Sequence, residues 1–184
     1  KTAYVADYGN GLQIIDVSNP KSPVLLGGYD TPGYAWSVYV SGNIAYVADE
    51  GSGLQIIDVS NPKMPTLLGS YDTSGYARSI HVSGSTAYVA DERCGLQIID
   101  VSNPKAPILL CNYATPDWAG CVYVSGNTAY VADEGSGLQL IDVSDPKAPT
   151  LLGSYNTQGF ATGVYVSGST AYVVDGLRGL LIIA

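Results

Sequence analysis

Pairs of acidic residues recur along this chain and are the first groups that could carry chemistry. They are Asp49-Glu50, Asp91-Glu92 and Asp133-Glu134. Clustered carboxylate oxygens are the ligands that Ca²⁺ prefers, so these six residues are candidate metal ligands. The alternating aspartates of a calcium-binding loop are absent, however. A solvated acidic rim that keeps the protein soluble is therefore the favoured interpretation, and no other cofactor is indicated.

Aromatic and arginine residues form a second candidate set, and their types suit binding rather than catalysis. Trp, Tyr and Arg are enriched at binding hot spots. The candidate partner or ligand face consists of Tyr34, Trp36, Tyr76, Arg78, Arg93, Trp118 and Phe160. The aromatic residues that recur once per copy could stack on a sugar or a peptide, or they could pack between neighbouring structural units.

The only histidine, His81, gives no sign of a catalytic role. It takes the place that Tyr39, Tyr123 and Tyr165 have in other copies of the same segment, so it is interpreted as a packing variant. Catalysis would need a nucleophile and a base at suitable positions, and the sequence indicates neither. We therefore predict that the protein is not an enzyme.

The candidate residues recur because the chain consists of one unit repeated, which predicts a single domain over residues 1–184. Copies begin every 42 residues and span 3–44, 45–86, 87–128, 129–170 and, in part, 171–184. A period of this length is typical of solenoids, propellers and related arrays.

Each unit contains four short apolar runs separated by turn residues, and none has helical spacing. Around the second unit the predicted strands are Ala35–Ser41 (inner), Ile44–Asp49 (second), Leu54–Val59 (third) and Thr66–Asp72 (outer). In the third strand, Ile56 and Ile57 point to opposite faces, so both faces must be covered. This pattern predicts an all-β propeller of four-stranded antiparallel blades, with an open solenoid as the alternative.

A second set of aspartates ends the third strand of each unit: Asp16, Asp58, Asp100 and Asp142. Each precedes a Ser-Asn-Pro or Ser-Asp-Pro turn. We expect these side chains to accept backbone N–H bonds and so fix the turn.

The recurring segments LQIIDVSNP and AYVAD resemble the LVIVD repeat of bacterial and archaeal cell-surface proteins. The resemblance covers the whole chain, and the motif reads LQIID, or LQLID at Leu138–Asp142. It implies a propeller that acts at the cell surface or outside the cell, and it transfers no catalytic residue.

The three cysteines, Cys94, Cys111 and Cys121, lie in one sector of the predicted propeller. Cys111 falls on an outer strand and Cys121 on the next inner strand, too far apart for a disulfide. Cys94 and Cys121 are less unfavourably placed, but free, partly buried thiols are the favoured interpretation. No spacing indicates a zinc site or haem attachment.

The given sequence starts and stops inside a blade, which predicts a partial or open-ended ring. Residues 1–30 lack an inner strand and residues 161–184 lack an outer one. Because unpaired strand edges invite association, we expect these ends to be covered by another chain or by residues beyond the given sequence.

The turns differ in how much they vary among copies. Turns such as Asp49–Gly53 and loops such as Asp72–Ser79 vary and should lie on one rim, the variable rim. Turns such as Ser41–Asn43 and Ser60–Lys63 are nearly unchanged and should lie on the other, the constant rim. The constant rim carries Lys21, Lys63, Lys105 and Lys147.

These patterns predict a non-catalytic extracellular or cell-surface module with a structural or protein-interaction role. The partner is another protein chain, and a copy of this chain could serve, through open blade edges or head-to-tail rims. A lectin-like propeller that binds carbohydrate or peptide is the alternative. The net charge of −8 and the lack of a basic patch argue against nucleic acid, and no segment could span a membrane.

Overall fold

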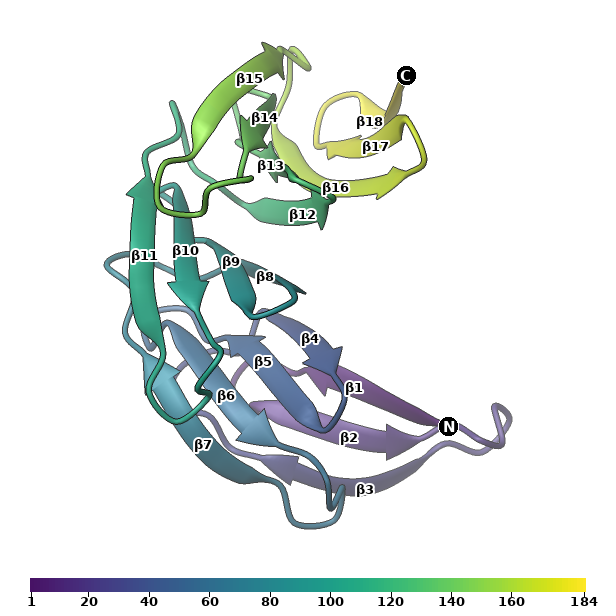
Figure 1. The fold of residues 1–184 in the computed structure, drawn as a ribbon. Coiled ribbons are helices and arrows are strands. Elements are labelled where there is room, and N and C mark those ends of the chain that lie inside the picture. The colour runs from purple at the N-terminus through teal and green to yellow at the C-terminus, as the bar shows by residue number, and fades with distance from the viewer.

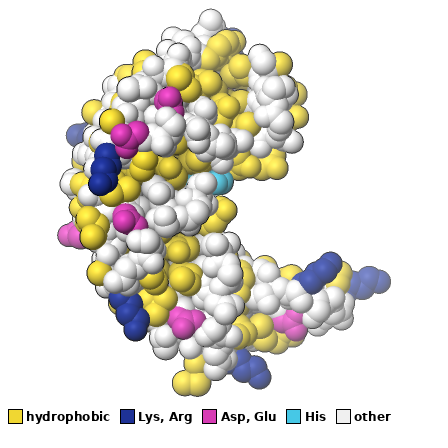
Figure 2. Space-filling view, in the orientation of Figure 1, with side chains coloured by type: hydrophobic (Ala, Val, Ile, Leu, Met, Phe, Trp, Pro, Cys, Tyr) yellow, Lys and Arg dark blue, Asp and Glu magenta, His cyan; other side chains and the backbone are white.

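The computed structural model describes all 184 residues and contains eighteen β-strands and no helix. The strands form five antiparallel sheets, which follow one another as blades around an open crescent (Figure 1). The space-filling view shows the same crescent, hollowed on its inner side between the first and last blades (Figure 2). The structure holds no helix that could cross a membrane.

The strand bounds repeat closely from blade to blade. Blade 1 contains β1 (Thr2–Ala6), β2 (Leu12–Asp16) and β3 (Val24–Tyr29). Blade 2 contains β4 (Ser37–Ser41), β5 (Ile44–Ala48), β6 (Leu54–Asp58) and β7 (Thr66–Tyr71). Blade 3 contains β8 (Ser79–Ser83), β9 (Thr86–Ala90), β10 (Leu96–Asp100) and β11 (Ile108–Tyr113). Blade 4 contains β12 (Cys121–Ser125), β13 (Thr128–Ala132), β14 (Leu138–Asp142) and β15 (Thr150–Tyr155). Blade 5 contains β16 (Ala161–Ser167), β17 (Thr170–Asp175) and β18 (Gly179–Ile183).

In every blade the strands pair in chain order; blades 2 to 4 have four strands, whereas blade 1 lacks the inner strand and blade 5 lacks the outer one. The propeller of four-stranded blades predicted from the repeat is therefore confirmed, as an open arc rather than a closed ring. The predicted strands are correct to within two residues at each end.

The largest difference is at the inner strand, which begins at Ser37 rather than at Ala35. Ala35 forms an isolated antiparallel bridge with Tyr8 of blade 1 instead. The same bridge joins Glu50 to Ala77, Glu92 to Ala119 and Glu134 to Ala161. Each bridge joins a second-to-third turn to the loop that leads into the next blade, so both kinds of segment lie on one rim, as predicted.

The aspartates that end the third strands act as expected. The N–H of Ser60 donates a 2.8 Å hydrogen bond to Oδ1 of Asp58, and the same bond recurs at Asp16, Asp100 and Asp142. The N–H of Val59 then bonds to the carbonyl of Asn43 at 2.8 Å. This bond ties together the two turns of the constant rim.

The core lies between blades, because both faces of the third strand are apolar. Ile56 and Ile57 have no exposed surface, which confirms the prediction made from their alternation. Ile56 packs with Ile80 and Val89 of blade 3, and Ile57 packs with Leu12 of blade 1. Each blade therefore completes its core against its neighbours.

On the outward face of blade 5, the apolar residues of the third strand have no neighbouring blade to cover them. Leu180 and Ile182 are 61% and 65% exposed, whereas their equivalents in blade 2, Leu54 and Ile56, are fully buried. The end of the arc thus presents half of a blade-to-blade interface.

Ile56 and Ile182 occupy equivalent positions, one buried and one exposed, and so form a matched pair for substitution. Ile56→Ala should lower the free energy of unfolding by about 2–5 kcal/mol, because it leaves a cavity in a packed interface. Ile182→Ala, at the equivalent exposed position, should change it by no more than about 0.5 kcal/mol. Denaturant unfolding of the dilute chain measures both, and equal losses would contradict the described packing.

Candidate functional site

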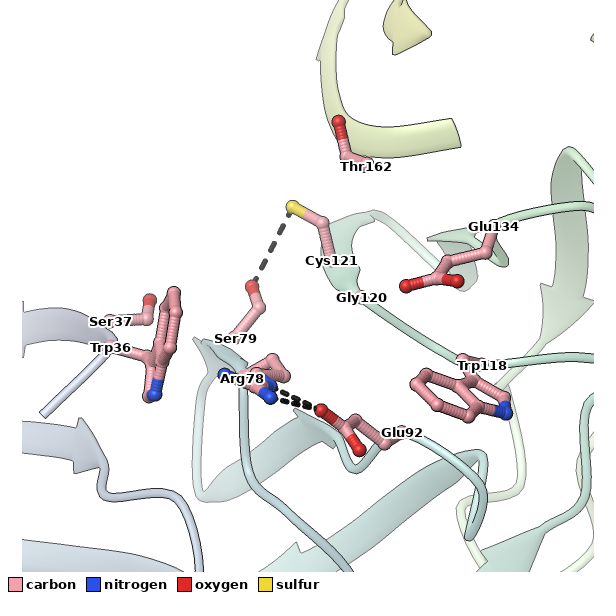
Figure 3. Close-up of a pocket in the computed structure, with 10 residues that line it drawn as sticks. All are labelled: Trp36, Ser37, Arg78, Ser79, Glu92, Trp118, Gly120, Cys121, Glu134 and Thr162. Atoms are coloured by element: carbon pink, nitrogen blue, oxygen red, sulfur yellow. Dashed lines mark hydrogen bonds and ion pairs between the residues drawn. The ribbon is translucent and has the colours of Figure 1, made fainter. Parts of the chain in front are cut away.

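A pocket of about 520 Å³ opens on the variable rim, where the loops of blades 2 to 5 converge on the hollow of the crescent. Figure 3 shows its lining, which includes Trp36, Arg78, Glu92, Trp118, Cys121 and Glu134. Three of the seven predicted face residues, Trp36, Arg78 and Trp118, line it.

The glutamates of the rim are placed by the bridges between blades. Glu50, Glu92 and Glu134 adopt left-handed backbone conformations, with φ of 43°, 44° and 33°. This conformation is costly for a residue with a side chain, and here two backbone hydrogen bonds to the next loop hold it. At Glu92 they join N–H and C=O groups to Ala119 at 3.1 and 3.0 Å. As a result the Glu92 and Glu134 side chains line the mouth of the hollow.

The aspartates of the same acidic pairs point inward. Asp49 is fully buried and accepts hydrogen bonds from the Thr31 hydroxyl at 2.5 Å and the Gly33 N–H at 2.8 Å. Asp91 is bound in the same way by Thr73 and Gly75, at 2.7 and 2.9 Å. Each carboxylate thereby fastens the loop that enters its own blade.

The structure separates the six carboxylates that were considered as calcium ligands. Asp49, Asp91 and Asp133 are buried under the loops, while Glu50, Glu92 and Glu134 point elsewhere. No three His, Cys, Asp or Glu side chains come together as a metal-binding group. The two members of each pair have separate roles because the turn sends successive side chains in different directions.

Burial has a clear effect on one of these aspartates. Removal from water raises the pKa of Asp91 from 3.8 to about 6, although hydrogen bonds from Thr73 and Gly75 oppose the shift. The acid form of this group is therefore favoured by folding.

Arg78 is the central cation of the rim. Its guanidinium lies 4.2 Å from the centre of the Trp36 ring and forms an ion pair with Glu92. The second terminal nitrogen of the guanidinium lies 3.6 Å from Oε1 of Glu50. These are the two ion pairs of the structure, so Arg78 is held between carboxylates from two blades and against an aromatic face.

Trp118 and Glu134 form the opposite wall of the pocket (Figure 3). The Arg93 guanidinium lies 4.6 Å from the Trp118 ring centre. Burial raises the pKa of Glu134, and the negative charges of Asp117 and Glu92 raise it further. Glu134 forms no ion pair.

The other predicted aromatic residues lie apart from the pocket. Tyr34, Tyr76 and Phe160 are 44%, 53% and 51% exposed, so about half of each residue's surface remains open to solvent. Tyr34 stacks on Tyr8 of the neighbouring turn, with ring centres 4.1 Å apart. None of the three rings lines the pocket, and Tyr34 contacts the turn of the preceding blade.

His81 belongs to a row of rings on the inner strands. Tyr39, His81, Tyr123 and Tyr165 follow one another with centre distances of 4.9, 4.8 and 5.2 Å. Burial lowers the pKa of His81, as expected for a packing residue. The three cysteines are free and partly buried, as predicted, and the Ser79 hydroxyl lies 3.6 Å from Cys121 Sγ.

Sequence reasoning missed five pocket residues: Ser37, Ser79, Gly120, Cys121 and Thr162. One signal could have found two of them. Trp36 and Arg78 occupy the same repeat position as Gly120 and Thr162, so this position differs in all four copies. Such variation within a uniform repeat marks the surface that differs most between blades.

The blades, their strand order and their recurring turns define an open β-propeller built from tandem repeats. The LVIVD repeat profile matches residues 2–31, 32–73, 74–115, 118–157 and 158–183. The chain therefore belongs to the LVIVD repeat family, and the resemblance drawn from its motifs is confirmed.

Solved structures agree on the fold. The RRP9 WD40 repeats match with a TM-score of 0.78 and 12% identity, over 98% of this chain and 58% of that one. The computationally designed Ika8 protein matches with a TM-score of 0.76 and 8% identity, over 98% of this chain and 54% of that one. The computationally designed Ika4 protein matches with a TM-score of 0.70 and 9% identity, over 83% of this chain and 92% of that one. This chain thus spans a little over half of the first two. No curated protein matches it in sequence.

The buried carboxylate of Asp91 predicts a specific pH effect. Its raised pKa means that its contribution to stability is full below about pH 4 and is lost as the pH rises through about 6. Asp91→Asn should therefore flatten the fall in unfolding free energy across this window, by at most about 3 kcal/mol. Urea unfolding at several pH values measures the difference between parent and variant.

A control of opposite sign is available on the constant rim. Hydrogen bonds from Ser60 lower the pKa of Asp58, so its contribution is lost as the pH falls. Asp58→Asn should remove that acid-side loss and leave the window of Asp91 unchanged. An Asp91→Asn variant with the parent's pH profile would show that the aspartate is not desolvated as described.

Proposed function

We propose that this chain is a non-catalytic protein-interaction module that works at the cell surface or outside the cell. The observation that carries the proposal is the pocket rim, where Trp36, Arg78 and Trp118 are held in place before any partner arrives. Arg78 is fixed by Glu92 and by the Trp36 ring, and Trp118 is contacted by Arg93. Side chains already ordered lose little entropy on binding, which favours affinity. The location rests on the family resemblance.

The pocket chemistry supports a binding role over catalysis. It contains an Arg–Glu ion pair, hydroxyl groups and one thiol, and it lacks an imidazole. The hydrogen-bond partners of Cys121 Sγ are the Ser79 hydroxyl and, at 4.0 Å, the Val164 carbonyl. Neither group is a base that could activate the thiol as a nucleophile.

The first experiment tests which rim binds. A displayed library of random peptides is selected on the parent chain, and the affinity of the selected peptides is then measured for variants. The combined Trp36→Ala, Arg78→Ala and Trp118→Ala variant should lose tenfold or more in affinity, because it removes the ordered hot-spot residues. The Lys63→Ala, Lys105→Ala variant should bind as the parent does. The reverse result would assign binding to the constant rim.

We further propose that the exposed end of the arc lets copies of the chain associate. Leu180 and Ile182 present an apolar surface whose equivalents are fully buried between blades 2 and 3. The outward face of blade 1, which exposes Val5, is the other half of such an interface. Joining the two faces would repeat the contact that already holds the blades together.

Self-association has a direct measurement in sedimentation velocity over a range of concentrations. Leu180→Glu with Ile182→Glu should shift the chain toward monomer, since each charge would be desolvated in the interface. Leu152→Glu, on the exposed face of outer strand β15, is the matched control and should leave association unchanged. A parent chain that stays monomeric at high concentration would refute association through this face.

A lectin-like role is the second candidate, supported by the exposed rings of Tyr34, Tyr76 and Phe160. Such rings can stack on the apolar face of a sugar. Binding on a glycan array that is lost when the three residues are replaced by Ala would favour this role over the first.

A further inference from the structure

Gly120 stands at the one place in the pocket lining where the repeat could carry a large side chain and does not. The other copies have Trp36, Arg78 and Thr162 at this position. A Cβ atom on Gly120 would meet only ordinary contacts, the nearest being the Ala132 carbonyl oxygen at 3.8 Å. Its backbone is not left-handed. Neither packing nor conformation therefore requires glycine here.

Arg78, one blade earlier, shows what this repeat position does when it carries a cation. Its guanidinium lies between Glu50 of blade 2 and Glu92 of blade 3. Because the units repeat every 42 residues, the equivalent carboxylates around Gly120 are Glu92 and Glu134. Arg78 therefore shows that two glutamates at these repeat positions can bind one guanidinium group.

The pocket occupies the side of Gly120 where these groups lie. Figure 3 shows Glu134, Trp118 and Glu92 around the same hollow, with Gly120 at its edge. Both contacts of Arg78 to Glu92 use Oε1, so Oε2 makes no bond with it. Glu134 has neither an ion-pair nor a hydrogen-bond partner for its side chain. Two carboxylates are therefore available to a ligand.

The charge of the site favours a cation. The two cations at the site, Arg78 and Arg93, are outnumbered by Glu50, Glu92, Glu134 and Asp117, and Asp117 is close enough to influence the Glu134 carboxyl. The chain as a whole carries a net charge of −8, which attracts basic partners and speeds their encounter. The Trp118 ring adds an aromatic surface beside the carboxylates; Arg93 lies over this ring but does not itself line the pocket.

We propose that this pocket binds the side chain of an arginine from a partner protein, between Glu92 and Glu134 and beside Trp118. The proposal deepens the interaction function and rests on it. Arginine fits better than lysine because its planar guanidinium can bond to two carboxylates at once and lie on an aromatic ring. Arg78 uses both kinds of contact in the neighbouring blade.

The probe is Nα-acetyl-arginine amide, and its neutral isostere is Nα-acetyl-citrulline amide. Titration is followed by NMR at the indole N–H signals of Trp36 and Trp118. The arginine probe should give a saturable shift at Trp118, and the citrulline probe should give none at equal concentration. Equal shifts from the two probes would overturn the proposal, because the site would then not recognise charge.

Two variants test separately the carboxylate of Glu134 and the open space beside Gly120. Glu134→Gln keeps the shape and should weaken the arginine probe about tenfold or more, the usual loss for a partly buried charged hydrogen bond. Gly120→Arg should abolish probe binding and raise the melting temperature, because the new side chain would bind the two glutamates itself. Parent-like affinity in either folded variant would contradict the proposal, and Glu134→Gln decides the matter if Gly120→Arg does not fold.

A matched control removes one negative charge from the other rim. Asp145→Asn restores the Asn that Asn19, Asn61 and Asn103 supply in other copies, so the turn is kept. It should bind the arginine probe as the parent does. A loss equal to that of Glu134→Gln would mean that only overall charge is sensed, which would overturn the specific site.

The peptide selection separates this proposal from the broader function. Selected peptides that need Trp36, Arg78 and Trp118, but contain no arginine and do not compete with the probe, would leave the interaction function standing and refute the arginine site. The opposite result is a probe that binds at Glu134 together with selected peptides that are insensitive to the triple variant. It would leave the arginine site standing and refute the interaction function of the rim.

Discussion

Burial of both faces of the third strand is the constraint on which this structure depends. Ile56 and Ile57 point to opposite sides and are both fully enclosed, so no blade can complete its core alone. The same packing brings each second-to-third turn against the next loop, where bridges such as Glu50 to Ala77 form. Asp49 and Asp91 then fasten those loops from within. The pocket rim is therefore a product of blade stacking and not of a separate loop structure.

The division between a uniform scaffold and a varied rim explains how identical units can build one distinct site. Asp58 and its equivalents fix the same turn in four blades, so the backbone path is the same in each. A single repeat position on the other rim then carries Trp36, Arg78, Gly120 or Thr162. Substitution at that position changes the site without disturbing the turns that present it.

The sequence is sufficient to predict the fold because its signals are local and repeated. Alternation in LQIID, turn residues and a fixed period all predict the same blades, and the predicted strand ends are wrong by only one or two residues. The functional site is harder to predict from the sequence. Trp36, Arg78 and Trp118 stand out by type, but Asp49 and Glu50 look like one acidic pair, since their opposite directions depend on a left-handed backbone. A single glycine such as Gly120 does not indicate a binding site in the sequence. Its role depends on Glu92 and Glu134, which only the fold brings beside it.

The exposed end faces have a consequence for motion. A blade inside the arc packs against two neighbours, whereas blades 1 and 5 pack against one, as Leu180 and Ile182 show. In arrays held by nearest-neighbour contacts, local opening is easiest at the ends and hardest in the middle. Amide hydrogens should then exchange in a gradient along the arc, fastest in the terminal blades. The central part of the pocket, where Arg78 forms its ion pair with Glu92, belongs to blade 3. The groups that would bind a partner therefore lie on the part of the chain that opens last.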